Sequence, residues 1–363
     1  MSATTNHSVT RGILPAVVLG VLFSLVLSVA TASAMRVYDG AFARHAQLRH
    51  HVAGKTKHRA HRRVRARAAA SPTFNLCAKA GTVTPDGAPG AIPIWGFAVR
   101  PVGGCAAATA GIPAPPLDVG AGDNVTLSIE NSLDEALHIS IPGITIDAGA
   151  TPNTRTINPG DTGTVSFTAS SPGTYLYESD GTAGRQAEVG LAGALIVRPP
   201  AAGQAYADAS TSYDTEALMV LSEIDANLNA TLPTPGGLAS FDMATWKPQY
   251  RLINGLSYPS TGTINSAAGS KVLLRYVNAG SEHVSMTLLG ADATVVGREG
   301  AFLTTPLGVT SETIPDGATA EEIVTIPAGA ASGTKFPIYD RNLNLVNGSA
   351  AGIGGRLRFI QVP

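Results

Sequence analysis

The sequence predicts an all-β protein built from two antiparallel β-sandwich domains. Between Ser71 and Pro363, short extended runs alternate with turn signals, as in FNLCAKAGTV, then PDGAPG, then AIPIWGFAVR. The runs lack the 3.6-residue period of amphipathic helices. The 40 Gly and 24 Pro in 363 residues suit many short strands joined by tight turns. The length fits two such domains.

Residues 1–35 are predicted to be a signal peptide or a membrane anchor. Residues 13–35 hold no charged side chain and are long enough to span a bilayer. They end in Ala32-Ser33-Ala34, a small-residue pattern that an export peptidase could cut. Only Arg11 precedes the apolar run, so no twin-arginine signal is indicated. Cleavage and anchoring both remain open.

Residues 36–70 are predicted to be a basic disordered linker, since they hold ten basic residues, the single acid Asp39 and few large apolar side chains. The positive-inside rule alone would keep this linker in the cytoplasm. It either contacts anionic lipid or cell-wall polymer, or acts as a solvated spacer. The chain after residue 70 has 14 basic and 25 acidic residues, a net charge of −11, which argues against nucleic-acid binding.

The first globular domain is predicted over residues 71–199. Asp123 to Glu130 alternates apolar and polar residues, as a half-buried strand does. LHISIPGITID, TGTVSFTAS and a last hairpin from Pro172 to Pro199 follow. Cys77 and Cys105, the only cysteines, lie 28 residues apart in this domain. In an exported chain they are expected to form a disulfide bond, and a reduced pair is the alternative in the cytoplasm.

Residues 200–213 (PAAGQAYADASTSY) are small and polar and are predicted to link the domains. The second domain is predicted over residues 214–363. Its first strand, in ALMVLSEIDANL, is apolar enough to be central, and KVLLRYVN at Lys271 to Asn278 is its clearest strand. A Gly-rich turn at Gly354 and Gly355 precedes the last strand.

The hairpin PGTYLYESDGTAGRQAEVGLAGALIVRP resembles a stretch of the multicopper oxidases, in which PGTYxYHSH is followed by a Gln and GLxGxLIV. The segments LDVGAGDNVTLSIEN and GSKVLLRYVNAG resemble two further strands of that family. The resemblance implies two Greek-key cupredoxin-like domains and an exported protein. The residues of the hairpin that match are Tyr175, Tyr177, Gln186, Gly190, Leu191, Gly193, Leu195, Ile196 and Val197.

The copper-binding residues of the family do not match in the first domain. Where the family has His-Ser-His, this chain has Glu178, Ser179 and Asp180. His138 falls on the first histidine of the family's LHxHG motif, and Ser140 on the second. His138 is therefore expected to be a hydrogen-bonded structural histidine rather than a ligand. Glu178 and Asp180 are either paired acids for catalysis or a hard cation, or part of a polar turn with its bend at Asp180-Gly181.

The second domain departs from the family in the same way. The family's HPxHLHG histidines correspond to Val284, Thr287 and Leu289, while His283 lies one position early and so on the opposite strand face. The family's His-Cys-His corresponds to Tyr339, Asp340 and Arg341. A blue copper centre needs the cysteine thiolate, so Met286 as an axial ligand has no function without it.

These observations predict a membrane-anchored or secreted protein without catalytic residues or cofactor. Its expected role is to bind an envelope protein or polymer, or to be a structural component of the cell envelope. Two-domain relatives form trimers, so the resemblance also implies a homotrimer. A rival hypothesis is a copper-dependent oxidoreductase with an atypical ligand set, for which the candidates are His138, His283, Met286, Glu178 and Asp180. A second rival is a polysaccharide- or peptide-binding module that uses tyrosines, Trp95 and Trp246.

Overall fold

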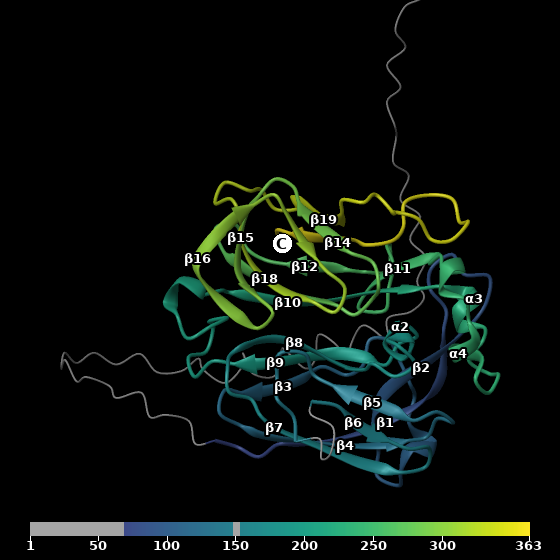
Figure 1. Cartoon of the computed structure of the whole chain (residues 1–363). Coiled ribbons are helices and arrows are strands. Elements are labelled where there is room, and N and C mark those ends of the chain that lie inside the picture. The colour runs from purple at the N-terminus through teal and green to yellow at the C-terminus, as the bar shows by residue number, and fades with distance from the viewer. Residues whose placement is uncertain (1–68, 148–152) are drawn as a thin grey trace, which may run out of the picture. The chain divides into compact units, whose positions relative to one another are not determined.

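Four β-sheets contain the strands of the computed structural model, which describes residues 69–147 and 153–363 (Figure 1). These residues belong to one compact unit of the chain, Arg65–Pro363. The predicted signal peptide or anchor and all but the last two residues of the basic linker lie outside the described residues. Among those that are described, no helix has the length and apolar composition needed to cross a membrane.

Two sheets form the first β-sandwich. The strand orders are β2-β1-β4-β7 in one sheet and β3-β9-β8-β5-β6 in the other. The strands are β1 Thr73–Val83, β2 Ile92–Val99, β3 Leu117–Gly120, β4 Asn124–Asn131, β5 Leu137–Ser140, β6 Arg155–Ile157, β7 Thr162–Thr168, β8 Gly173–Ser179 and β9 Ala192–Arg198.

Buried and more exposed residues alternate along β4, and the buried ones contribute to the core of this sandwich. Val125, Leu127 and Ile129 are buried, whereas the residues between them lie on the outer face. This pattern arises because successive side chains of a strand point to opposite faces of the sheet. Each buried aliphatic side chain contributes roughly 1.5–3 kcal/mol by leaving water. The predicted half-buried strand over Asp123–Glu130 is therefore confirmed.

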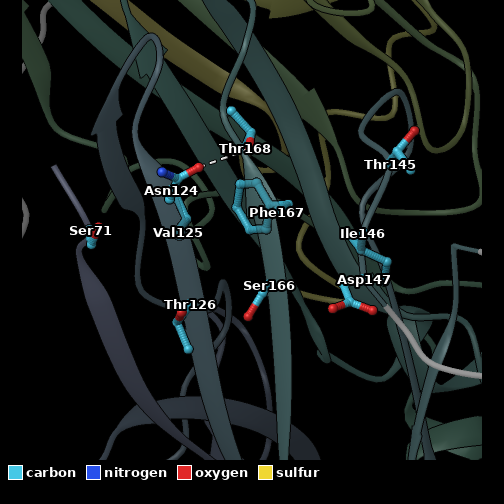
Figure 2. Close-up of a pocket in the computed structure, with 10 residues that line it drawn as sticks. All are labelled: Ser71, Asn124, Val125, Thr126, Thr145, Ile146, Asp147, Ser166, Phe167 and Thr168. Carbon is cyan, nitrogen blue, oxygen red and sulfur yellow. Dashed lines mark hydrogen bonds between the residues drawn. The ribbon is translucent and has the colours of Figure 1, made fainter. Parts of the chain in front are cut away.

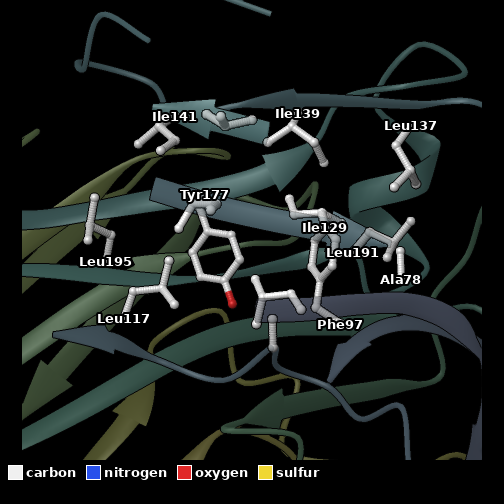
Figure 3. Packing of buried hydrophobic residues seen from close by; sticks show 14 of the residues in the cluster. Ala78, Phe97, Leu117, Ile129, Leu137, Ile139, Ile141, Tyr177, Leu191 and Leu195 are labelled. Atoms are coloured by element: carbon white, nitrogen blue, oxygen red, sulfur yellow. The ribbon is translucent and has the colours of Figure 1, made fainter. Parts of the chain in front are cut away.

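Aromatic and aliphatic side chains from both sheets fill this core (Figure 3). Tyr177 of β8 is fully buried, and its ring centroid lies 5.8 Å from that of Phe97 on β2. Its hydroxyl donates a hydrogen bond of 2.6 Å to the carbonyl of Pro115, which satisfies the polar end of the side chain. Leu137 and Ile139 of β5 also point inward, so His138 and Ser140 face outward.

A disulfide bond joins Cys77 of β1 to Cys105 at the start of the 3-10 helix η1 (Cys105–Ala107). The two Cα atoms are 5.6 Å apart, within the usual range for this bond. The expected pairing is therefore present in the structure. It ties the connection between β2 and β3 to the middle of β1.

The other two sheets form the second β-sandwich. The strand orders are β11-β10-β13-β18-β15-β16 and β12-β20-β19-β14-β17. The strands are β10 Thr215–Ile224, β11 Tyr250–Ile253, β12 Thr263–Asn265, β13 Lys271–Asn278, β14 Val284–Leu288, β15 Asp292–Arg298, β16 Ala301–Val309, β17 Ser311–Ile314, β18 Thr319–Thr325, β19 Lys335–Asp340 and β20 Leu357–Gln361. The two β-sandwiches confirm the predicted fold class.

Strand β13 is buried along nearly its whole length because both of its faces are covered. Val272, Leu274 and Tyr276 point into the core of the second sandwich. Leu273 and Arg275 point the other way, toward the linking segment and the first sandwich, which β13 contacts through β8. Apolar residues therefore stand on both faces of KVLLRYVN, as expected for a strand that is covered on both sides.

Short helices interrupt the connections between strands. The connection between β8 and β9 includes a helix of one turn, α2 (Arg185–Glu188). The predicted linker contains the 3-10 helix η2 (Ala209–Thr211). Two residues of this linker, Tyr206 and Thr211, are buried. The remaining helices are α3 Ala226–Asn229, α4 Gly237–Ser240 and the 3-10 helix η3 Met243–Thr245.

Candidate functional site

Strands β5 and β8 bring together the four side chains that match the family's copper histidines in the first domain. Ser140 lies directly opposite Glu178 in the antiparallel pair. The backbone N–H of Asp180 donates a hydrogen bond of 2.9 Å to the carbonyl of His138. Residues opposite each other on paired strands share a face, and so do residues two positions apart. His138, Ser140, Glu178 and Asp180 therefore lie on one outward face.

The four side chains supply mainly oxygen ligands. Burial raises the pKa of Glu178 to about 7, and the charge of Asp180 adds to this shift. His138 is the single imidazole among them, and that imidazole makes no hydrogen bond to the described residues. The expectation of a hydrogen-bonded side chain was therefore wrong: only the backbone of His138 is bonded, its N–H donating to Ser179 Oγ at 2.9 Å, because the side chain lies on the outer face of β5. No group of three or more His, Cys, Asp or Glu side chains in the described part of the chain is placed to hold a metal ion. This set does not fit a copper cluster, which needs histidines in pairs.

The polar turn predicted around Glu178 and Asp180 begins later than expected. Glu178 and Ser179 belong to β8, and Glu178 pairs with Ala192 of β9 as well as with Ser140. The turn starts at Asp180 and leads into α2. The prediction was wrong for Glu178 because the strand pairing of β8 on both sides outweighs the turn preference of the residues that follow.

In the second domain, the positions that match copper histidines hold side chains without a nitrogen or sulfur atom that could bind copper. Val284 is part of the hydrophobic core, and Leu289 is 48% exposed. Thr287 is buried, and its hydroxyl has no hydrogen-bond partner among the described residues. Met286 is also in the core. Val284 and Met286 thus pack in the core, Thr287 is buried outside that cluster, and Leu289 is exposed, so these four side chains do not converge on one point.

Asp340, at the position of the family's copper thiolate, is buried beside an arginine. Arg356, fully buried, places one guanidinium nitrogen 3.4 Å from Asp340 Oδ2 and pairs with the buried carboxylate of Glu223. The same guanidinium nitrogen lies 3.6 Å from Glu282 Oε2, and Glu282 forms a bidentate pair with Arg251. A guanidinium thus supplies positive charge at this end of the sandwich.

Burial shifts the protonation of this cluster in both directions. It lowers the pKa of Arg356 to about 9, although the charge of Glu188 opposes the shift. It raises the pKa of Asp340. Both shifts have the same cause, because a low-dielectric surrounding disfavours the charged form of either group. The mutual pairing of Arg356 with carboxylates offsets part of that cost.

Glu188 of α2 extends the cluster to the first sandwich. Its carboxylate accepts hydrogen bonds from Trp246 Nε1 at 3.2 Å and from Ser281 Oγ at 2.8 Å. Burial raises its pKa to about 7, and these two hydrogen bonds oppose the shift. Nothing in the sequence pointed to Glu188 or Glu223, since each is a single acid in a segment of ordinary composition.

The remaining candidates of the sequence analysis lie apart from this cluster. The side chain of His283 is 71% exposed, and its Nδ1 is 3.2 Å from Oδ1 of the exposed Asp316. His283 therefore faces solvent, as its shifted position on the strand allows. Trp95 is buried in the first core, and Trp246 is partly buried against it. The two tryptophans do not form an exposed aromatic row.

A shallow pocket of about 560 Å³ lies on the outer face of β4 and β7 (Figure 2). Its polar lining consists mainly of hydroxyl and amide groups, and Thr168 Oγ1 donates a hydrogen bond of 3.0 Å to Asn124 Oδ1. Asp147 adds one carboxylate. Threonine is common on exposed strand faces because its branched side chain suits the sheet, so this lining by itself indicates no ligand.

A family model described as multicopper oxidase matches residues 104–202. Among solved structures, the chain is similar to a blue copper oxidase from Nitrosomonas europaea, with a TM-score of 0.66, 21% identity, and coverage of 80% of this chain and 86% of that one. It is also similar to a copper nitrite reductase from Nitrosomonas europaea, with a TM-score of 0.60, 18% identity, and coverage of 81% and 94%.

The multicopper oxidase Fet3p is similar with a TM-score of 0.58 and 20% identity over 80% of this chain and 52% of that one. No curated protein matches the sequence significantly. Identities near 20% establish the fold and not the activity. The chain therefore has the fold of the multicopper oxidases.

Proposed function

We propose that the protein is a copper-free relative of the multicopper oxidases that acts as a binding or structural component of the cell envelope. The observation that carries the proposal is Asp340, which stands at the position of the copper thiolate and pairs with the buried Arg356. A guanidinium is always a donor and cannot ligate a metal. The positive charge that a copper ion would bring is here provided by a side chain.

An envelope location is supported by two features of the chain. The disulfide bond between Cys77 and Cys105 suits an oxidising compartment. Residues 13–35 have the length and composition of an export signal or anchor. Fractionation of cells, followed by protease treatment of intact and lysed samples, tests this location. The intact samples are cells whose wall and any outer membrane have been removed, so degradation only after lysis would contradict export.

The rival copper oxidoreductase receives little support from the ligands. It requires His138 and His283 to approach one metal, yet His138 is on the outer face of β5 and His283 is paired with Asp316 at the surface of the second sandwich. Met286 is enclosed in the core. The module that binds polysaccharide or peptide through tryptophans is disfavoured by the burial of Trp95.

Copper content is the deciding measurement. The protein is purified from cells grown with added copper, next to a known multicopper oxidase that is treated identically. Metal is measured by mass spectrometry, and a visible spectrum is recorded. We expect the oxidase to hold stoichiometric copper and show its blue band, and this protein to show neither. Stoichiometric copper in this protein would overturn the proposal and favour the oxidoreductase.

A further inference from the structure

A cleft of about 500 Å³ lies where the two sandwiches meet the segment that joins them. Ser171 and Tyr175 line it from the first sandwich, and Tyr206 and Asp208 from the joining segment. Glu299 and Phe302 line it from the hairpin of β15 and β16. The cleft thus requires three segments that are far apart in the sequence, and it is separate from the positions that match copper ligands.

The lining combines aromatic rings with carboxylates. The rings of Tyr206 and Phe302 are in contact, with centroids 5.4 Å apart. Tyr175 donates its hydroxyl to the carbonyl of Ser171 at 3.0 Å. Asp208 and Glu299 supply two carboxylates, and none of the described residues that line the cleft is Lys, Arg or His. The lining therefore carries negative charge without an opposing cation.

A further buried carboxylate lies behind the aromatic wall. The hydroxyl of Tyr206 donates a hydrogen bond of 2.8 Å to Glu321, which is fully buried. Arg275 forms ion pairs with two carboxylates: its Nη1 lies 3.5 Å from Glu321 Oε1, and its Nε lies 2.5 Å from Glu216 Oε1. Burial raises the pKa of Glu299, and the charge of Glu321 adds to that shift. The cleft is therefore a place where an incoming positive charge is stabilised.

Glu299 has an unusual backbone for its residue type. Glu299 and Gly300 form a two-residue turn with φ angles of 50° and 68°, as in a type I′ hairpin. Such turns prefer Asn, Asp or Gly at the first position, so a glutamate there is strained. A Cβ atom on Gly300 would lie 2.3 Å from the ring of Tyr175, so the turn is packed directly against the first sandwich. Strain held in place by packing is often associated with function.

We propose that this cleft binds an alkylammonium group, supplied either by a free polyamine or by a lysine side chain of a partner protein. Asp208 and Glu299 provide charged acceptors for the ammonium group. The partly exposed ring of Phe302 provides a surface for its methylene chain and for cation–π contact, while Tyr175 and Tyr206, which are 5% and 3% exposed, form the apolar floor of the cleft. The pair of carboxylates on an otherwise uncharged lining favours a cation over a neutral sugar or an anion.

Calorimetric titration of the full-length protein tests the proposal. The probes are cadaverine, its neutral diol analogue, and an acetylated lysine amide. We expect saturable binding of an amine that weakens as salt is added, and no binding of the diol. Binding of cadaverine alone identifies a polyamine as the source, and binding of the lysine amide identifies a protein side chain. Failure of both amines, or equal binding of the diol, would overturn the proposal.

Three variants and one control separate binding from folding. Asp208→Asn and Glu299→Gln each remove one carboxylate and should weaken amine binding by about tenfold to a hundredfold. Glu299→Asn also removes the charge, but it places a preferred residue in the turn, so the midpoint of thermal unfolding should rise while binding weakens. The exposed Asp292 lies at the start of β15, the strand that leads into the turn, and does not line the cleft, so Asp292→Asn should leave binding unchanged. Unaltered binding by Glu299→Asn and Asp208→Asn would contradict the inference.

This inference does not depend on the absence of copper, because the cleft shares no residue with the positions that match copper ligands. A chain that held copper could still bind an amine here, and a chain without copper could fail to do so. The metal measurement and the titration therefore succeed or fail separately.

Discussion

Glu321 and Glu322 are adjacent in β18, point to opposite faces of the strand, and are both buried. Glu321 faces the first sandwich, where it accepts the backbone N–H of Thr174 at 2.7 Å. Glu322 shares its face with Ala320 and Val324, which belong to the core of the second sandwich. Burial raises the pKa of Glu322 to about 8, the charge of Glu312 adds to the shift, and a hydrogen bond with Tyr276 opposes it.

The buried carboxyl of Glu322 predicts a loss of stability with rising pH. Between about 4.5 and 8, the folded protein keeps a proton that the unfolded chain releases. The free energy of unfolding should therefore fall over this range, by at most about 1.4 kcal/mol per pH unit from this group, and level off above it. Glu322→Gln cannot ionise, so it should be more stable than the natural protein at the upper end. Thermal unfolding followed across the range measures this.

The exposed Asp134 provides the control for this experiment, because Asp134→Asn removes a carboxylate that is in solvent. Its profile should follow that of the natural protein. Parallel profiles for Glu322→Gln and the natural protein would show that Glu322 is not the group responsible.

The pairing of β5 with β8 keeps the geometry of a metal-binding face while changing its chemistry. Ser140 is opposite Glu178, and His138 and Asp180 flank them on the same face. Side chains directly opposite on antiparallel strands have Cβ atoms about 4.5–5.5 Å apart, which suits two imidazoles on one ion. The residue types, and not the backbone, limit what this face can bind.

Restoring histidines should therefore create a metal site on this face. Ser140→His together with Glu178→His gives three imidazoles with His138, next to the carboxylate of Asp180. We expect the double variant to bind Cu²⁺ or Zn²⁺ much more tightly than the natural protein, since imidazole suits both ions. Calorimetric titration with each metal measures this, and Ser140→His alone, with two imidazoles, should be intermediate. Equal metal affinity in all three proteins would mean that the side chains do not share a face.

Ion pairs buried between the two sandwiches make them one unit. Arg275 of β13 donates to Thr174 of β8 at 3.0 Å and pairs with Glu216 and Glu321. Arg198 at the end of β9 pairs with Glu216 at 2.7 Å and with Asp118. On the other side of the interface, Glu188 accepts hydrogen bonds from Trp246 and Ser281. Polar contacts that need both sandwiches should make unfolding cooperative.

Removal of Arg275 is therefore expected to destabilise the whole protein. Arg275→Met leaves Glu321 buried without its cation, which should cost about 3–5 kcal/mol. Urea unfolding followed by circular dichroism gives this difference. The exposed Arg341 makes no ion pair among the described residues, so Arg341→Met should change the stability by less than about 0.5 kcal/mol. A loss of similar size in both variants would contradict a specific role for Arg275.

The sequence by itself determined the all-β class and strands such as β4 and β13, and it showed which residues stand at the positions that resemble the family's copper ligands. These follow from local pattern and residue identity, which do not depend on distant contacts. The sequence also limited any disulfide bond to Cys77 and Cys105, its only cysteines, but left a reduced pair open; the structure has the bond.

Only the tertiary structure decided where the charges are buried. Arg356 meets Glu223, which is 133 residues away, and Glu321 meets the backbone of Thr174, which is 147 residues away. A lone Glu or Arg normally indicates an exposed position, because burial is costly without a partner. Whether a partner is present depends on how β8, β13, β18 and β20 are brought together. The cleft between the sandwiches depends on the same packing and has no local signal.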